Sequence, residues 1–109
     1  MSRPPDLVQG TLDALILQTV ALEPLHGLAV AQRLRARSAD VLRVSQGSLY
    51  PALHRMEQEG WLQSSWLVTE KGRKAKMYEL TDRGRAQLAT EKESWDRLTR
   101  GVSRVLRYT

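Results

Sequence analysis

The stretch that decides the fold is SQGSLYPALHRMEQEGW, residues Ser45 to Trp61. Within it Leu49, Leu53 and Met56 recur at intervals of three and four residues, the spacing that places side chains on one face of an α-helix. Because the three residues share one stripe, we expect them in the hydrophobic core. The stretch therefore predicts a short helix with one buried face.

Pro51 and Gly60 set the expected ends of this helix. Proline costs about 3 kcal/mol in a helix interior but little in the first turn, where its missing N–H would have no intrahelical partner. We therefore predict Ser48 as the N-cap, which makes Pro51 the third helical residue. Glycine at position 60 suits the left-handed conformation that ends many helices, and Trp61 then begins the next element.

Two helices are expected before this one. The first, which Asp6 or Thr11 would cap, has apolar residues at helical spacing: Leu12, Leu15, Ile16 and Val20. The segment EPLHG then breaks the pattern, and His26 within it is expected as a turn or cap residue. The second helix is short, with apolar positions at Leu28, Ala31 and Leu34. A brief extended piece is expected at Val41, Leu42 and Val44, where helical spacing is interrupted.

After Gly60 the apolar pattern changes to a period of two, which is typical of β-strands. The alternating positions are Leu62, Ser64, Trp66 and Val68 on one strand, and Lys76, Tyr78 and Leu80 on the next. The segment EKGRK between them predicts a β-hairpin with a basic tip, which carries Lys71, Arg73 and Lys74.

A long last helix is predicted from an N-cap at Thr81 to about Leu106. Leu88, Trp95 and Val102 repeat every seven residues, and Leu98 and Val105 lie three residues beyond the last two. The rest of so small a chain cannot cover a helix of this length, so we expect these five residues at the interface of a homodimer.

The order of three helices, a basic hairpin and a long helix predicts the fold class. We expect an α+β, mainly α protein, with a winged helix-turn-helix domain at residues 1–80 and a C-terminal dimerisation helix at residues 81–109. In such a fold the third helix enters the major groove of double-stranded DNA, and the hairpin reaches an adjacent groove or phosphates.

Composition agrees with an anionic partner. The 109 residues carry 17 basic against 12 acidic side chains, a net charge of +5, which favours nucleic acid ahead of a membrane surface. No cysteine is present, which excludes disulfides and thiolate zinc sites. No apolar run is long enough to span a bilayer, and MSRPPD does not resemble the start of a signal peptide, so we expect a soluble, cytoplasmic protein.

Enzymatic function is not predicted. His26 and His54 fall on different expected elements, and the sequence has no histidine pair at metal-ligand spacing, no glycine-rich phosphate loop and no serine elbow. We expect no cofactor, no metal site and no catalytic residue.

Five segments together resemble the PadR family of bacterial transcriptional regulators: QGTLDALIL, PLHGLAVAQRL, QGSLYPALHRMEQEGWL, KGRKAKMYELTDRGR and ESWDRL. The resemblance runs from about Gln9 to Leu98. It is closest to the short members with one C-terminal helix, and to a group first noticed in acidobacterial genomes. It implies a homodimer that binds a palindromic operator, usually as a repressor.

The expected DNA contacts come from two places. At the third helix they are Ser45, Gln46, Ser48, Tyr50, His54 and Arg55, and at the hairpin Lys71, Arg73, Lys74 and Lys76. Several have a structural alternative: Ser48 could only cap, Tyr50 could pack, His54 could lie on an exposed face, and Lys76 could lay its stem along the sheet beside Tyr78.

Trp95 has two interpretations. The motif ESW resembles the last helix of multidrug-sensing family members, which implies a small aromatic effector stacked between subunits at this tryptophan. The alternative is ordinary packing in the dimer interface. A rival function for the whole chain is a winged-helix module that binds an acidic protein, which would expose apolar side chains near the third helix.

Overall fold

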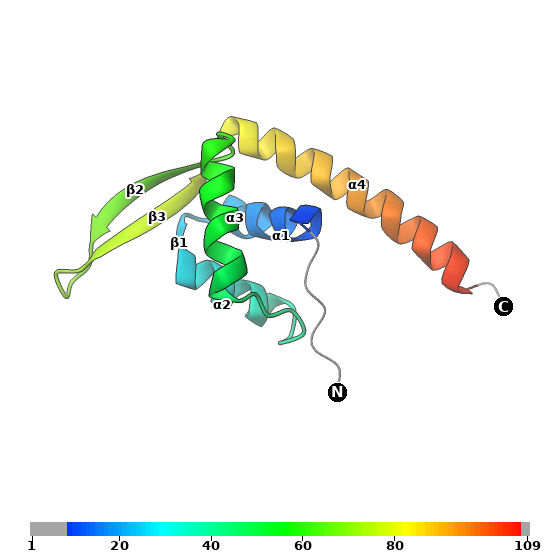
Figure 1. Cartoon of the computed structure of the whole chain (residues 1–109), viewed down its shortest axis with the longest axis horizontal. Helices are drawn as coiled ribbons and strands as arrows, with labels where there is room; N and C mark the ends of the chain where they lie inside the picture. The colour runs from blue at the N-terminus through cyan, green and yellow to red at the C-terminus, as the bar shows by residue number, and fades with distance from the viewer. Residues whose placement is uncertain (1–8, 108–109) are drawn as a thin grey trace.

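The computed structural model describes residues 9–107, which form four helices and three strands. In chain order they are α1 (Gln9–Leu22), β1 (Leu25–His26), α2 (Gly27–Arg37), α3 (Gln46–Gln58), β2 (Leu62–Val68), β3 (Lys74–Leu80) and α4 (Asp82–Arg107). Figure 1 shows α1 to α3 as a central body, from which the β2–β3 hairpin extends on one side and α4 on the other. The predicted winged-helix fold is confirmed.

The core lies where the three short helices meet the base of the hairpin. Ile16 and Leu17 of α1, Val30 of α2, and Leu49 and Leu53 of α3 are completely buried there. The remaining core residues include Met56, Leu62, Tyr78, Leu80 and Leu88. The stripe predicted for α3 is therefore confirmed.

The sheet has three strands in the order β1-β3-β2, all antiparallel. In the hairpin Leu62 pairs with Leu80 and Val68 with Lys74, which brings the turn to residues 69–73. The pattern of the sequence did not predict β1, a two-residue strand that pairs Leu25 with Tyr78. The piece expected to be extended at residues 41–44 is non-helical but forms no strand, and it is part of the irregular segment between α2 and α3.

Two details of the first helices also differ from expectation. Thr11 lies inside α1 and does not cap it, whereas Asp6 falls outside the described residues. In α2 the buried positions are Gly27, Val30 and Leu34, whereas Leu28 is exposed. The helix begins at Gly27, and the face formed by Gly27, Val30 and Leu34 is the one that turns toward the core. His26 is confirmed as a cap residue, since its Nδ1 accepts a hydrogen bond from the N–H of Ala29 at 3.1 Å.

The start predicted for α3 was wrong. Its N-cap is Ser45, whose hydroxyl oxygen accepts from the N–H of Ser48 at 3.2 Å, so Pro51 is the sixth helical residue. Its missing N–H leaves the carbonyl of Gly47 without an intrahelical donor. Both residues are exposed, so water can hydrate that carbonyl, and the earlier start brings a fully satisfied serine cap.

The other end of α3 follows the prediction. Gly60 is left-handed with φ +79°, and two backbone bonds close the turn: Gly60 N–H to Glu57, and Trp61 N–H to Met56 at 3.0 Å. This is the Schellman arrangement, which satisfies the last carbonyl groups of the helix.

The start of α4 is fixed against the end of α3. The Thr81 hydroxyl accepts from the N–H of Gly84 at 3.0 Å and donates to the carbonyls of Gly60 and Trp61, so Thr81 is confirmed as the cap. Gly84 is buried, and a Cβ built on it would lie 2.1 Å from the Trp61 carbonyl oxygen. Only glycine lets the backbone of α4 approach Trp61, just before β2, this closely.

Replacing Gly84 by alanine should therefore lower the free energy of unfolding by about 1–3 kcal/mol or more, because the carbonyl it meets belongs to the backbone and cannot rotate away. Urea unfolding followed by circular dichroism measures the change. Gly47→Ala is the matched control, since an added Cβ there meets only the Ser45 hydroxyl at 3.9 Å and should be neutral or stabilising. Equal stability of the two variants would contradict the close approach.

Candidate nucleic-acid interface

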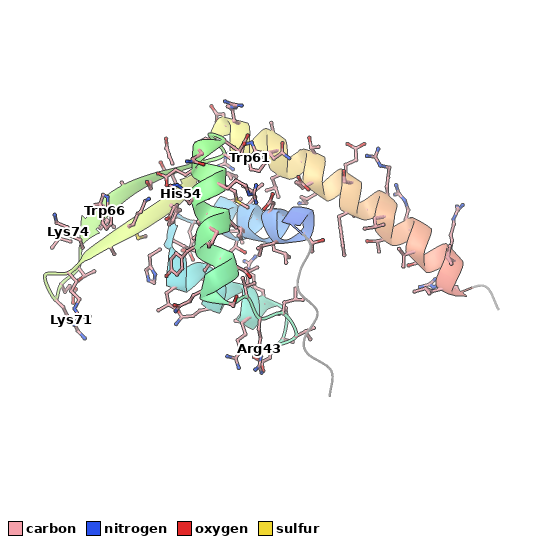
Figure 2. All side chains as sticks on the ribbon, viewed as in Figure 1. Arg43, His54, Trp61, Trp66, Lys71 and Lys74 are labelled. Carbon is pink, nitrogen blue, oxygen red and sulfur yellow. The ribbon has the colours of Figure 1, made fainter. Side chains whose placement is uncertain are left out.

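Among residues 9–107, no other element covers one face of α3. Its exposed residues are Gln46, Gly47, Ser48, Tyr50, Pro51, His54 and Gln58. Figure 2 shows His54 on this helix close to where the hairpin leaves the body. We call these seven residues the exposed α3 face.

The N-terminus of α3 is polar. Ser45 and Ser48 lie with their hydroxyl oxygens 3.2 Å apart, and Gln46 beside them is exposed. Unpaired N–H groups at a helix start attract phosphate, and hydroxyl and amide side chains can hydrogen-bond to phosphates or base edges. The cap role of Ser45 leaves its neighbours Gln46 and Ser48 available for a ligand.

Tyr50 and His54 lie on the exposed α3 face with partial intramolecular contacts. The Tyr50 ring lies against Gly27, where an added Cβ would come 2.6 Å from its Cε1, yet the residue remains 43% exposed. The His54 ring lies 3.3 Å from the Gln58 amide nitrogen, one turn along the helix. Tyr50 thus packs against Gly27 and still leaves part of its side chain exposed for a ligand.

Arg55 lies at the edge of α3 that turns toward α1. Its guanidinium donates to the carboxylate of Asp13, a residue of α1 that is almost completely buried. Burying that carboxylate without a partner would be costly, so the pair holds α3 onto α1. This bond ties the guanidinium to the helix body and makes Arg55 a positioning residue for α3.

The hairpin turn is tight and basic. The Thr69 N–H donates to the Arg73 carbonyl at 2.7 Å, and Gly72 adopts φ +76° to close the turn. Lys71, Arg73 and Lys74 are exposed, and within residues 9–107 none of them takes part in an ion pair. We call these three residues the basic tip.

Lys76 differs from the basic tip because it has a partner on α3. Its Nζ donates to Glu57 at 3.0 Å and lies 5.3 Å from the centre of the Tyr78 ring, while the Ser64 hydroxyl donates to the other Glu57 oxygen. The bond from Ser64, followed by that from Lys76, lowers the pKa of Glu57, and the same carboxylate raises the pKa of Lys76. The three side chains brace the hairpin against α3.

Arg43 is an exposed cation that was not among the predicted DNA contacts. It lies just before α3, where Figure 2 labels it, and shares Asp40 with Arg35. Hydrogen bonds from Arg35 and Arg43 lower the pKa of Asp40 to about 2, so Asp40 stays ionised, and two arginines against one carboxylate leave the cluster with a net positive charge. In the sequence, the position of Arg43 two residues before the N-cap of α3 is the feature that could have indicated it.

The five residues expected at a dimer interface divide into two groups. Leu88 is buried in the core of the chain itself, whereas Trp95, Leu98, Val102 and Val105 are exposed along α4. Leu106, which the heptad pattern passed over, is 76% exposed and extends this stripe.

A groove of about 600 Å³ lies between α1 and α4. Trp95 and Leu98 line it from α4, Ala14 and Leu15 from α1, and Leu42 from the loop before α3. Charged residues lie along it as well, namely Glu91, Lys92 and Asp96.

Metal sites and membrane-spanning helices were also not found among the described residues. Among residues 9–107 no group of three or more metal-ligating side chains converges. None of the helices in this range has the length and apolar character needed to cross a membrane.

The model of the Transcriptional regulator PadR-like family matches residues 16–90. The chain belongs to this family. Its members are transcriptional regulators that bind DNA and are not enzymes. The transcriptional regulator Rv3488 of Mycobacterium tuberculosis is 39% identical over 87 residues, 80% of this chain and 78% of the relative.

Solved structures of PadR-like regulators have the same architecture. One from Bacillus cereus is 30% identical with a TM-score of 0.79, covering 94% of this chain and 97% of its own. Another, from Eggerthella lenta, is 30% identical with a TM-score of 0.80, covering 93% and 86%.

Proposed function

We propose that this PadR-like regulator is a repressor that binds a palindromic operator as a homodimer, through the exposed α3 face and the basic tip. The observation that carries the proposal is an exposed face of α3, polar at its N-terminus, on a helix whose C-terminal end is bonded to the basic hairpin through Glu57 and Lys76. We also propose that it is one of the short, acidobacterial-type members, with residues 1–80 for DNA and residues 81–109 for dimerisation.

The two parts of the interface have different roles in this proposal. Gln46, Ser48, Tyr50 and His54 read base edges and phosphates in the major groove, whereas the basic tip neutralises phosphates whatever the sequence. Arg55 and Lys76, both held by carboxylates of the chain, position these groups.

Replacing Arg73 and Lys74 by alanine should weaken binding to all DNA sequences alike. It should also flatten the dependence of log K on log salt by about 2 per protomer, because two phosphate contacts are lost. Footprinting should show an inverted repeat with half-sites one or two helical turns apart, and Gln46→Ala should change which bases are preferred. Arg97→Ala, on α4, is the charge control. Absence of any preferred site at low salt would contradict operator binding.

Dimerisation is proposed through the exposed stripe of α4. From Lys92 to Val102 every residue is exposed, and an isolated helix of this length is marginal in water. A second copy of α4, packed on the stripe and in the groove beside α1, would bury Trp95, Leu98, Val102 and Val105 together. The same packing would set the distance between the two α3 helices.

The double variant Leu98→Glu, Val102→Glu should be a monomer or fail to fold, because charges would enter the apolar contact. Light scattering on the unmodified chain should give twice the monomer mass. Arg100→Ala, Arg104→Ala makes the same change in net charge on the opposite face of α4 and should remain dimeric. A well-folded dimer of the glutamate variant would place the interface elsewhere.

An effector site at Trp95 is a second proposal, supported by the groove. A flat aromatic cation could stack on this indole while Glu91 or Asp96, which also line the groove, supply opposite charge. It would release DNA only by preferring one spacing of the two wings over another.

Titration with ethidium-like or Hoechst-like dyes should quench tryptophan fluorescence at micromolar concentration. The quenching should disappear in Trp95→Ala, although Trp61 and Trp66 still report in that variant. Quenching that persists without Trp95 would leave this residue with a packing role alone.

A further inference from the structure

The strand β2 ends in three consecutive exposed apolar residues. Trp66 is 64% exposed, Leu67 53% and Val68 71%, although the base of the same strand is buried at Leu62. The fold does not need apolar side chains here, because this part of the hairpin extends beyond the body (Figure 1). An exposed apolar group of this kind marks a contact surface.

The strand register divides the three residues between two faces. Trp66 pairs with Lys76 and Val68 with Lys74, so these four side chains share one face of the hairpin, whereas Leu67 points to the other. Ser64, two residues before Trp66 and on the same face, donates to Glu57 of α3. The face that carries Trp66 therefore turns toward α3, and we call it the inner wing face.

The inner wing face continues the candidate interface. Its cations are Lys74 and Lys76, with Lys71 and Arg73 in the adjoining turn. The carboxylate that reaches it, Glu57, is already paired with Lys76, and Glu70 lies in the turn. Apolar side chains alternating with positive charge suit a polyanion that also has apolar surface.

Double-stranded DNA has such a surface between its two grooves. When a helix occupies the major groove, the backbone that borders the groove lies in the corner between that helix and the hairpin. This backbone presents phosphates to cations and the apolar edges of deoxyribose to flat side chains, and proteins that enter the minor groove often use apolar side chains there.

We propose that Trp66, with Val68 beside it, packs on deoxyribose of the DNA strand that runs between α3 and the hairpin. The inference rests on the proposed operator binding. It adds an apolar contact to the polar and basic contacts of that interface, and this contact is sensitive to the width of the groove. Lys74 on the same face would hold the adjacent phosphate.

Trp66→Ala tests the inference, with Leu67→Ala as the matched control on the opposite face of the same strand. The first variant should lose about tenfold in DNA affinity, with an unchanged slope of log K against log salt, because an apolar contact releases no counterions. Leu67→Ala should stay within about twofold of the unmodified chain. Val68→Ser should fall between the two.

Two further readouts separate the contact from folding and assembly. Thermal unfolding and light-scattering mass of Trp66→Ala should match those of the unmodified dimer, since the side chain is exposed. Acrylamide quenching of tryptophan fluorescence should decrease when DNA is added to the unmodified chain, and the decrease should be smaller in Trp66→Ala.

The outcomes distinguish this inference from the proposed function. If the unmodified chain binds its site and Trp66→Ala binds equally well, the contact is wrong while operator binding stands. If Trp66→Ala changes the dimer mass, or binds a protein partner less well at unchanged DNA affinity, the patch is a protein contact and the inference is overturned. Failure of the unmodified chain to bind DNA would refute the proposed function itself.

Discussion

The junction of Trp61, Thr81 and Gly84 is the constraint on which the rest of the structure depends. Thr81 caps α4 with its hydroxyl oxygen while donating to the end of α3, and its backbone N–H donates to the Trp61 carbonyl at 3.0 Å. The same carbonyl fills the space that a side chain at Gly84 would need. The end of α3, both ends of the hairpin and the start of α4 are thereby fixed at one point.

From this junction the molecule extends in two directions with different surfaces. The hairpin carries the basic tip and leans on α3 through Glu57, whereas α4 carries an apolar stripe away from the body. The proposed DNA contacts and the proposed dimer contacts therefore lie on different elements, and they need not compete for the same residues.

The helix α1 connects these two sides. Its Ala14 and Leu15 line the groove beside Trp95, and its Asp13 holds Arg55 of α3. Breaking this ion pair would leave an uncompensated buried charge, so the pair favours one arrangement of α1 and α3. The helix α1 thus contacts both the groove and α3, and a ligand in the groove could change DNA binding only through a difference in affinity between two arrangements.

The sequence by itself determined the features that depend on neighbours along the chain. Helical and alternating spacings predicted α3, the hairpin and α4, while Gly60 and Thr81 marked helix ends through local backbone geometry. Even locally the start of α3 was misjudged: Ser45 caps the helix in place of Ser48, and Pro51 is tolerated as its sixth residue, where the carbonyl of Gly47 that lacks a donor is exposed to water.

The tertiary structure decided which predicted residues are free to act. Asp13 and Arg55 are separated by 42 positions, and Glu57 and Lys76 by 19, so no local spacing announces either pair. The two-residue strand β1 exists only because β3 offers it an edge, and Leu88 joins the core because the junction directs the first turns of α4 over α1. Periodicity records which residues share a face, whereas the partner of that face depends on how distant segments pack.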